Sequence, residues 1–273
     1  MPISGATQLA AVIGWPVEHS RSPAIHNAAA TAAGVDLVYT AQPVAPGHGA
    51  AAASAMRTLG IRGLSVTMPH KADVMSALDE VTPVAKALGA VNHITNTDGH
   101  LVGNNTDGSG FLLGLAHDAD LDVNNMTVGV FGAGGAARSI IHACGAAGAE
   151  VVVVARDRER AAQAAQVGNG NARVGSMDEF AAVDIAVNAT PIGMAGSDSA
   201  SHLAFDVGAL GDGTVVVDIV YNPLDTPLLE AASKRGLSRV DGLSMLVGQA
   251  AAQFEAWTGV AAPMAVMREA ARH

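Results

Sequence analysis

The first hundred residues alternate between short apolar runs and helix-like segments. Three apolar runs have the length of β-strands: Leu9–Ile13, Leu37–Gln42 and Gly63–Met68. Ser22-Pro23 predicts a helix start between the first two, because serine suits the N-cap and proline the first helical position. Residues 50–59 predict a second helix. This part of the chain therefore has the alternation of an α/β domain.

Glycines mark where several of these elements end. Gly34 and Gly60 follow the two expected helices. The pair Asp98-Gly99 separates the apolar runs 91–97 and 100–103, and this dipeptide favours the tight turn of a β-hairpin.

A second alternating pattern begins near residue 108. Strands are expected at 126–131, 151–155, 183–188 and 214–219, with helices at 136–145 and 158–166. Such βαβ alternation predicts a parallel sheet with helices on both faces. Two further helices, 243–257 and 263–271, are expected at the end of the sequence. The fold class is thus α/β with two domains.

Composition narrows the possible functions. The 273 residues are 49% hydrophobic with a formal net charge of −10, which argues against a nucleic-acid groove or an anionic membrane surface. The single Cys144 fits a reducing compartment. We see no signal peptide, no membrane-spanning run and no H-x-x-x-H metal pair, so we expect a cytoplasmic protein without a metal site.

A glycine motif follows the first strand of the second half. Gly132, Ala133, Gly134, Gly135 and Ala136, with the next alanine, have the form G-x-G-x-x-A between a predicted strand and a predicted helix. The first glycine permits a tight turn, and the second lets a pyrophosphate approach the backbone. The helix N-terminus supplies N–H donors for the phosphates. We therefore predict a dinucleotide site.

The residues after the next strand bear on the choice of dinucleotide. Arg156 stands where an NAD site often carries an acid, and Arg160 lies one helical turn further on. Guanidinium groups suit the 2′-phosphate of NADP. Asp157 keeps NAD possible, because a carboxylate there can bind a ribose hydroxyl.

Three polar segments of the first half are candidates for the chemistry. They are His19–Pro23 with two serines at a helix start, Ser65–Lys71 at a strand end, and Gly89–Asn92 followed by Asn104–Gly108 near the domain junction. Each taken alone has an ordinary explanation: a helix cap, a surface lysine and an Asn/Asp-rich turn.

Together these segments resemble the shikimate dehydrogenase family, and the resemblance runs over nearly the whole chain. The matching segments, in order, are 14–16 with 19–23, 66–71, 89–92, 105–108, 132–137, 188–190, Asp218 with Tyr221, and Asp241-Gly242 with Gln249. Two positions depart from the family: the family often has Asn-Arg-Thr where this chain has Ala155-Arg156-Asp157, and the residue before the catalytic lysine, here His70, varies. His70 leaves quinate open as a second substrate.

The resemblance implies a role for each candidate. Lys71 and Asp107 would be the catalytic pair around the reacting oxygen. The substrate-binding set would be Ser20 and Ser22 on the carboxylate, Thr67, Asn92 and Gln249 on ring hydroxyls, and Tyr221 beside the substrate. The cofactor set would be the glycine turn, Arg156, Arg160, Thr190, Ile219, Gly242 and Met245.

The implied protein is an NADP-dependent shikimate dehydrogenase of aromatic amino acid biosynthesis, a monomer or homodimer acting on a small molecule. Residues 1–106 plus 243–273 would bind substrate, and residues 107–242 would form the Rossmann-like cofactor domain. As hydride reaches the C3 carbonyl of 3-dehydroshikimate, a lysine ammonium can stabilise the oxygen and donate a proton. Which of Lys71 and Asp107 moves the proton stays open.

Three alternatives compete. A quinate/shikimate dehydrogenase preferring NAD would carry the same catalytic pair. A catalytically silent regulator of the same family should have lost Lys71 or Asp107, and both are present. A folate dehydrogenase is disfavoured by the serine pair Ser20 and Ser22.

Overall fold

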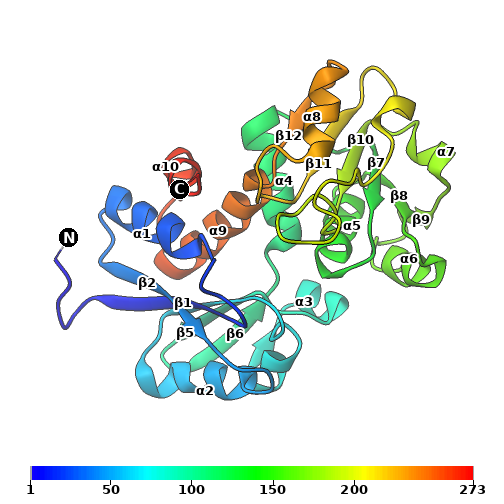
Figure 1. Cartoon of the computed structure of the whole chain (residues 1–273). Coiled ribbons are helices and arrows are strands. Elements are labelled where there is room, and N and C mark those ends of the chain that lie inside the picture. The colour runs from blue at the N-terminus through cyan, green and yellow to red at the C-terminus, as the bar shows by residue number, and fades with distance from the viewer. Residues whose placement is uncertain (1, 273) are drawn as a thin grey trace. The chain divides into compact units, whose positions relative to one another are not determined.

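The computed structural model describes residues 2–272 and divides into two compact units. Unit 1 holds the residues up to Thr106 together with those from Val247 onward, and unit 2 holds residues 107–246. Within the described residues each unit has one six-stranded sheet with helices packed on it (Figure 1). The predicted fold class, α/β with two domains, is confirmed. Nowhere in residues 2–272 does a helix combine the length and apolar character needed to cross a membrane.

The sheet of unit 1 is mixed, with strand order β2-β1-β3-β5-β6-β4. Its strands are β1 (Gln8–Gly14), β2 (Leu37–Pro43), β3 (Gly63–Val66), β4 (Glu80–Val81), β5 (His93–Thr97) and β6 (His100–Asn104). β1 runs parallel to β2 and β3, whereas β5 is antiparallel to β3 and β6. The predicted hairpin is confirmed, since Asp98 and Gly99 have φ of 52° and 89°, the positive values of a type I′ turn.

The helices of unit 1 are α1 (Ser22–Ala33), α2 (Gly49–Leu59), the 3₁₀ turn η1 (Asp73–Ala77), α3 (Pro83–Leu88), the part of α9 (Leu243–Thr258) from Val247 onward, and α10 (Met264–Ala270). Gly34 and Gly60 end α1 and α2 in the left-handed conformation, as expected. The predicted cap at Ser22 is wrong. Arg21 occupies the N-cap position, and Ser22 is the first helical residue.

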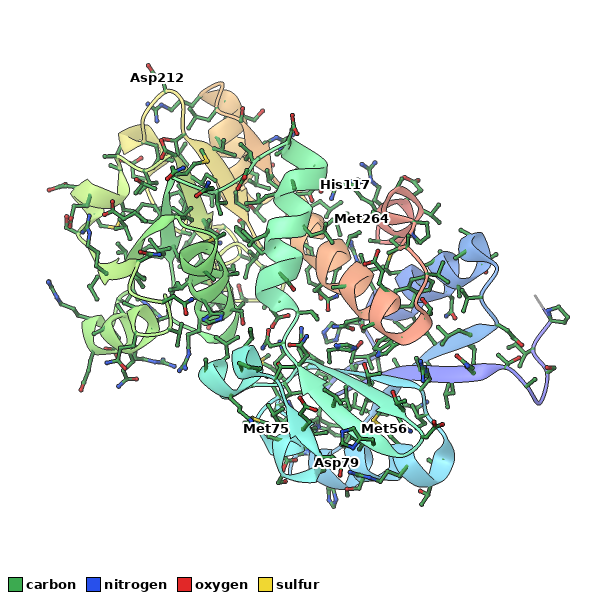
Figure 2. The ribbon with its side chains drawn as sticks, turned by 180° about the vertical axis from the view of Figure 1, so that it is seen from behind. Met56, Met75, Asp79, His117, Asp212 and Met264 are labelled. Atoms are coloured by element: carbon green, nitrogen blue, oxygen red, sulfur yellow. The ribbon has the colours of Figure 1, made fainter. Side chains whose placement is uncertain are left out.

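Alternation along the strands separates the two faces of this sheet. Ala11, Leu64 and Val66 belong to a core cluster with Met56 of α2, which is fully buried (Figure 2). The opposite face is more polar, and there the backbone of Gly63 lies against the α9 residue Trp257. A Cβ on Gly63 would come within 2.2 Å of the Trp257 ring. Only glycine leaves room for this indole.

The sheet of unit 2 is wholly parallel, with strand order β12-β11-β10-β7-β8-β9. Its strands are β7 (Thr127–Phe131), β8 (Glu150–Val154), β9 (Ala172–Val174), β10 (Ile185–Asn188), β11 (Val215–Asp218) and β12 (Arg239–Val240). One face packs on α4 (Asp107–Ala119), α5 (Gly135–Ala146) and α6 (Arg158–Ala165). The other packs on α7 (Met177–Phe180), the 3₁₀ turn η2 (Val207–Ala209) and α8 (Pro227–Lys234). The prediction of a parallel sheet covered on both faces is confirmed.

Candidate substrate and cofactor sites

Thr67 lies at the carboxyl edge of the unit 1 sheet, next to the end of β1. Its backbone N–H donates to Ile13 O at 3.0 Å. A Cβ on Gly14 would come within 2.4 Å of the Thr67 methyl carbon. Gly14 therefore makes room for Thr67 at this edge, where open α/β folds commonly place ligands.

Backbone hydrogen bonds bring Lys71 and Asn92 to the same edge. Lys71 O accepts from Val91 N–H at 2.7 Å, and Asn92 O accepts from Val66 N–H at 2.8 Å. Asn92 is buried, and Lys71 is partly exposed. Thr67, Lys71 and Asn92, named from the sequence, thus converge within unit 1.

The ring of His70, the residue before Lys71, is enclosed by the protein. It is fully buried, its Nε2 lies 2.7 Å from Val44 O, and a Cβ on Gly49 would come within 2.9 Å of it. This ring packs between Val44, which follows β2, and Gly49, the first residue of α2. Quinate as a second substrate stays a prediction.

The two serines at the start of α1 differ in their contacts. Ser20 Oγ accepts from the Ser22 N–H at 3.3 Å, so Ser20 supports the first turn that Ser22 was expected to cap. The Ser22 hydroxyl hydrogen-bonds to the Tyr39 phenol, which in turn donates to Ser65 Oγ at 2.6 Å. Burial raises the pKa of Tyr39 above its ordinary value, so this phenol stays protonated.

Gln249 joins the same buried network from α9. Its Oε1 accepts from Gln253 Nε2 at 2.7 Å, and the same nitrogen donates to Thr106 Oγ1 at 3.1 Å. Thr106 N–H then donates to Asn92 Oδ1 at 2.7 Å. The substrate candidates Ser22 of α1, Asn92 just before β5 and Gln249 of α9 are therefore tied together. The connecting side chains, which had no predicted role in the site, are Tyr39, Ser65, Thr106 and Gln253. One signal was available, because Ser65 lies two residues before Thr67 on β3.

Asp107 is the first residue of α4 and belongs to unit 2. It is 8% exposed. The next residue, Gly108, packs so closely on α5 that a Cβ there would come within 2.3 Å of Ser139 O. Asp107 is thus positioned by the helix pair α4–α5, whereas Lys71 belongs to unit 1.

The glycine turn of unit 2 has the open geometry that a pyrophosphate needs. Gly132 has a φ of 135°, and a Cβ there would come within 2.8 Å of Ala189 O. Gly134 is the N-cap of α5 without a side-chain cap, and Gly134 and Gly135 have no atom within 4 Å of a built Cβ. The start of α5 is therefore uncrowded at both glycines, and no side chain among residues 2–272 caps its first N–H groups. These residues fit a dinucleotide pyrophosphate.

The loops after β10 and β11 are joined by a buried acid. Asn188 Nδ2 donates to Asp218 Oδ1 at 2.9 Å, and Thr226 Oγ1 donates to Asp218 Oδ2 at 2.7 Å. Burial raises the pKa of Asp218 to about 6, although these bonds and one from Val220 N–H act to lower it. Thr190 is held here too, its hydroxyl donating to Asn188 Oδ1 at 2.7 Å.

The same loops, and the residues just beyond them, hold Ile219, Gly242 and Met245, which were predicted to bind the nucleotide, and Tyr221, which was predicted to lie beside the substrate. Ile219 and Tyr221 follow β11 directly and are partly exposed. A Cβ on Gly242 would come within 2.4 Å of Val220 O, so the chain leading into α9 passes close to this loop. Met245, three residues further on, is partly exposed as well. β7, β10 and β11 are parallel neighbours, so their carboxyl ends bring Thr190 and Ile219 to the edge that carries the glycine turn.

Asp157 has a structural role at the tip of β8. It is the N-cap of α6, and its Oδ1 accepts from the N–H groups of Glu159 and Arg160 at 3.0 and 3.1 Å. Arg156 and Arg160 on either side of it are exposed. The carboxylate that kept NAD possible is engaged by the helix, and the guanidinium groups carry positive charge beside it.

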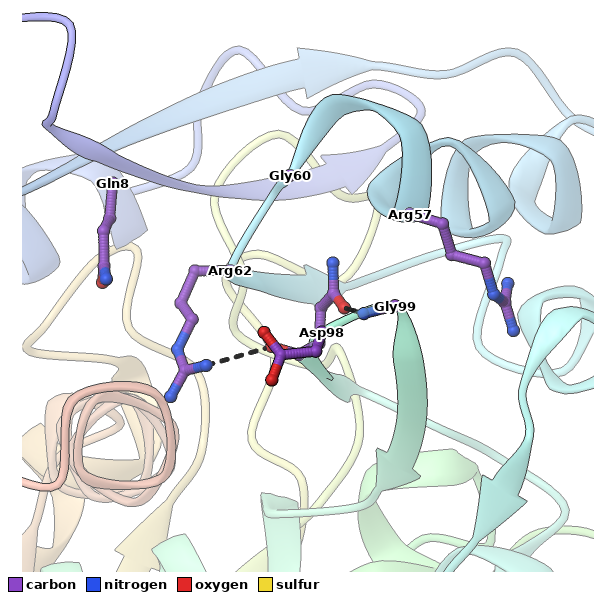
Figure 3. A pocket seen from close by; sticks show the side chains of 7 residues that line it. Gln8, Arg57, Gly60, Arg62, Asp98 and Gly99 are labelled. Carbon is purple, nitrogen blue, oxygen red and sulfur yellow. Dashed lines mark hydrogen bonds between the residues drawn. The ribbon is translucent and has the colours of Figure 1, made fainter.

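A pocket of about 350 Å³ in unit 1 lies at the other edge of the sheet (Figure 3). It is lined by Gln8, Arg57, Gly60, Arg62, Asn96, Asp98 and Gly99. Arg62 donates to Trp257 O and Asn96 O, and Arg57 pairs with Asp79 at 2.7 Å. The guanidinium groups of Arg57 and Arg62 are thus engaged by carboxylate and carbonyl groups of the protein itself. None of the candidate substrate residues, all of which lie within residues 2–272, lines this pocket.

Family models match three successive parts of the chain. The shikimate dehydrogenase substrate binding domain matches residues 12–94, a coenzyme F420-dependent NADP oxidoreductase domain matches 127–222, and the shikimate 5′-dehydrogenase C-terminal domain matches 242–272. An NADP(+) shikimate dehydrogenase from Citrifermentans bemidjiense is 41% identical over 282 residues, covering 99% of this chain and 96% of that protein. The chain belongs to the shikimate dehydrogenase family.

Solved structures of this family share the fold. The shikimate 5-dehydrogenase of Thermus thermophilus, in complex with NADP(H) and shikimate, has a TM-score of 0.89 and 34% identity, covering 97% of this chain and 98% of that one. A quinate dehydrogenase from Corynebacterium glutamicum, in complex with NAD, has a TM-score of 0.87 and 34% identity over 97% and 98% of the two chains. Shikimate dehydrogenase relatives thus include proteins named for a different substrate and cofactor.

Proposed function

We propose that this protein is a shikimate dehydrogenase that reversibly reduces 3-dehydroshikimate to shikimate with NADPH, in the pathway to aromatic amino acids. The observation that carries this proposal is the convergence of Thr67, Lys71 and Asn92 at one sheet edge, with Ser22 and Gln249 tied to it through buried hydrogen bonds. Hydroxyl, ammonium and carboxamide groups suit a small substrate that carries a carboxylate and several ring hydroxyls.

Each unit has its own part in the proposed reaction. Unit 1 would bind shikimate, with Ser20 and Ser22 on the carboxylate and Tyr221 of unit 2 beside the ring. Unit 2 would bind the dinucleotide through the glycine turn, Arg156, Arg160, Thr190, Ile219, Gly242 and Met245. Bound NADPH supplies the hydride.

Residues of the protein would stabilise the negative charge that forms on the C3 oxygen and supply one proton to it. The Lys71 ammonium would stabilise the negative charge that grows on this oxygen and is a donor for its proton. Asp107, held rigidly at the start of α4, would orient the ammonium or accept from a neighbouring hydroxyl. The protein would act in the cytoplasm as a monomer or homodimer, and its one cysteine, the buried Cys144, suits a reducing compartment.

Arg156 is the residue on which the NADP assignment depends most. Arg156 and Arg160 would each give the 2′-phosphate a charge-assisted hydrogen bond of about 1.5–3 kcal/mol, and exposure moves each toward the lower end. Arg156→Ala should therefore weaken NADP⁺ by roughly ten-fold and leave NAD⁺ nearly unchanged.

The test is a reduced-nicotinamide absorbance assay that crosses shikimate and quinate with NADP⁺ and NAD⁺. Shikimate with NADP⁺ should give the highest kcat/KM, and Ser20→Ala and Ser22→Ala should mainly raise KM for shikimate. Higher kcat/KM for quinate with NAD⁺ would establish the second candidate instead, which the similarity to a quinate dehydrogenase favours.

A further inference from the structure

A buried chain of hydrogen bonds runs beneath the candidate substrate residues of unit 1. The Tyr39 hydroxyl donates to Ser65 Oγ at 2.6 Å, and Ser65 Oγ lies 2.5 Å from Gln253 Oε1. From Gln253 the chain divides, since its Nε2 donates to Gln249 Oε1 at 2.7 Å and to Thr106 Oγ1 at 3.1 Å. Gln253 itself is 1% exposed.

The direction of every bond in this chain follows from its first member. Burial raises the pKa of Tyr39, so the phenol keeps its proton and donates it to Ser65. Ser65 has one proton and must donate it to Gln253. Gln253 therefore presents its carbonyl oxygen to Ser65, and its NH₂ group faces the other two partners.

This direction also determines how the candidate substrate ligand Gln249 is oriented. Gln249 accepts from the Gln253 NH₂ group and so must face Gln253 with its oxygen, which leaves its own NH₂ group directed away from Gln253. The Thr106 hydroxyl, which also accepts from Gln253, lies 3.3 Å from Asn92 Oδ1 and 3.5 Å from Gln249 O. The Asn92 carboxamide is oriented by the Thr106 backbone N–H, which donates to Asn92 Oδ1 at 2.7 Å and does not depend on Gln253.

We propose that Gln253 is a positioning residue that makes Gln249 a hydrogen-bond donor toward the substrate. The Gln249 NH₂ group would meet a ring hydroxyl oxygen as its acceptor. The proposal rests on the proposed function, in which Gln249 binds a hydroxyl of shikimate.

The surroundings make the arrangement rigid. Trp257, one helical turn beyond Gln253, is 1% exposed and donates through its indole N–H to Ile94 O at 3.1 Å. The ring of Tyr39 stacks on His26 at 4.3 Å. Because these side chains are buried away from water, a donor or acceptor left without a hydrogen-bond partner would raise the free energy of the folded protein. The reversed orientations of the Gln249 and Gln253 amides are therefore disfavoured.

Replacing Gln253 with a side chain of similar length and no hydrogen-bonding end tests this proposal. Gln253→Met should raise KM for shikimate by about ten-fold, about 1.4 kcal/mol, with KM for NADP⁺ and kcat changed much less. Added to Gln249→Ala, the same change should raise KM by a smaller factor than it does alone, because Gln253 acts through Gln249.

Asn96→Leu provides the matched structural control. Asn96 is a buried amide of the same unit that donates to Met56 O and Ile61 O and accepts from Gly99 N–H, at the opposite end of β5. Its loss should lower the melting temperature and leave KM for shikimate unchanged. A Gln253→Met variant that also lowers only the melting temperature, or raises both KM values equally, would overturn the proposal.

Neutron crystal structures of the full-length wild type and Gln253→Met, which distinguish an amide NH₂ group from its oxygen, separate this proposal from the function on which it rests. A wild type that does not turn over shikimate defeats the proposed function. In that case the structures still decide the positioning role, which predicts that the Gln249 carboxamide reorients in the variant. An unchanged Gln249 orientation would refute it.

Discussion

Two histidines buried in unit 1 should make the protein sensitive to acid. His26 stacks on Tyr39 with ring centroids 4.3 Å apart, and within residues 2–272 neither of its ring nitrogens has a hydrogen-bond partner. Burial, followed by repulsion from His93, lowers the pKa of His26 from 6.5 to about 3. Burial lowers the pKa of His93 to about 4. Both rings are neutral in the folded protein at every ordinary pH.

The free energy of unfolding depends on pH because these histidines have a lower pKa in the folded than in the unfolded protein. Above pH 6.5 both states hold these histidines neutral, and their contribution to stability is complete. As the pH falls toward 3 or 4, only the unfolded chain takes up the protons, so the free energy of unfolding drops by about 1.4 kcal/mol per pH unit for each histidine. At pH 5 the loss is about 2 kcal/mol for each of the two.

The perturbation is His26→Phe, which keeps the stacked ring and removes the titration. Urea unfolding followed by far-ultraviolet circular dichroism at pH 8, 7, 6 and 5 measures the free energy for both proteins. Asp218, whose raised pKa changes stability in the opposite direction, is the same in both and cancels in the difference. The variant should gain about 2 kcal/mol on the wild type between pH 8 and pH 5. Parallel curves would show that His26 does not stay neutral in the fold.

Three further predictions concern single residues. Lys71→Ala should lower kcat by roughly 10²–10⁴-fold with little change in cofactor affinity, and steady-state kinetics with near-normal kcat would remove it from the catalytic role. Asp157→Ala should cost about 1 kcal/mol of stability through the lost α6 cap and raise the kcat/KM ratio of NADP⁺ to NAD⁺; an unchanged ratio would mean that this charge does not reach the cofactor. Gly108→Ala should lower the unfolding free energy by about 1–3 kcal/mol because its Cβ meets a backbone carbonyl of α5, whereas Gly5→Ala, with open space around it, should not; equal effects would contradict the close helix packing.

Local rules predicted much of this fold. Gly34, Gly60 and Asp98-Gly99 ended helices and made a turn as their chemistry requires, because glycine and aspartate tolerate positive φ. The same rules hold at two helices that were not predicted from the sequence. Thr82 and Thr226 each cap a helix that begins at the following proline, and neither α3 nor α8 was predicted, although both carry the Thr-Pro signal.

Sequence motifs identify the candidate residues themselves. They do not identify the residues that orient these candidates through hydrogen bonds. Thr67 follows β3 directly and Lys71 comes shortly after it, so their placement near the carboxyl edge of the sheet could be deduced from the sequence. Gln253 depends on Ser65, 188 positions away in sequence, and on the face of α9 that meets the sheet. No local pattern specifies such a pairing, since it arises only when β3 and α9 pack. For the same reason Ser22 was assigned to a cap, when its hydroxyl is engaged by Tyr39.

The indole that fills the space above Gly63 has a practical consequence. The protein has two tryptophans, Trp15 and Trp257, and both belong to unit 1. Trp15 is 51% exposed and Trp257 is 1% exposed. Intrinsic tryptophan emission therefore reports on unit 1 alone, and a soluble quencher such as iodide separates the two emitters. Set beside a probe of backbone structure, which senses both units, this emission tells whether the two units unfold together or in turn.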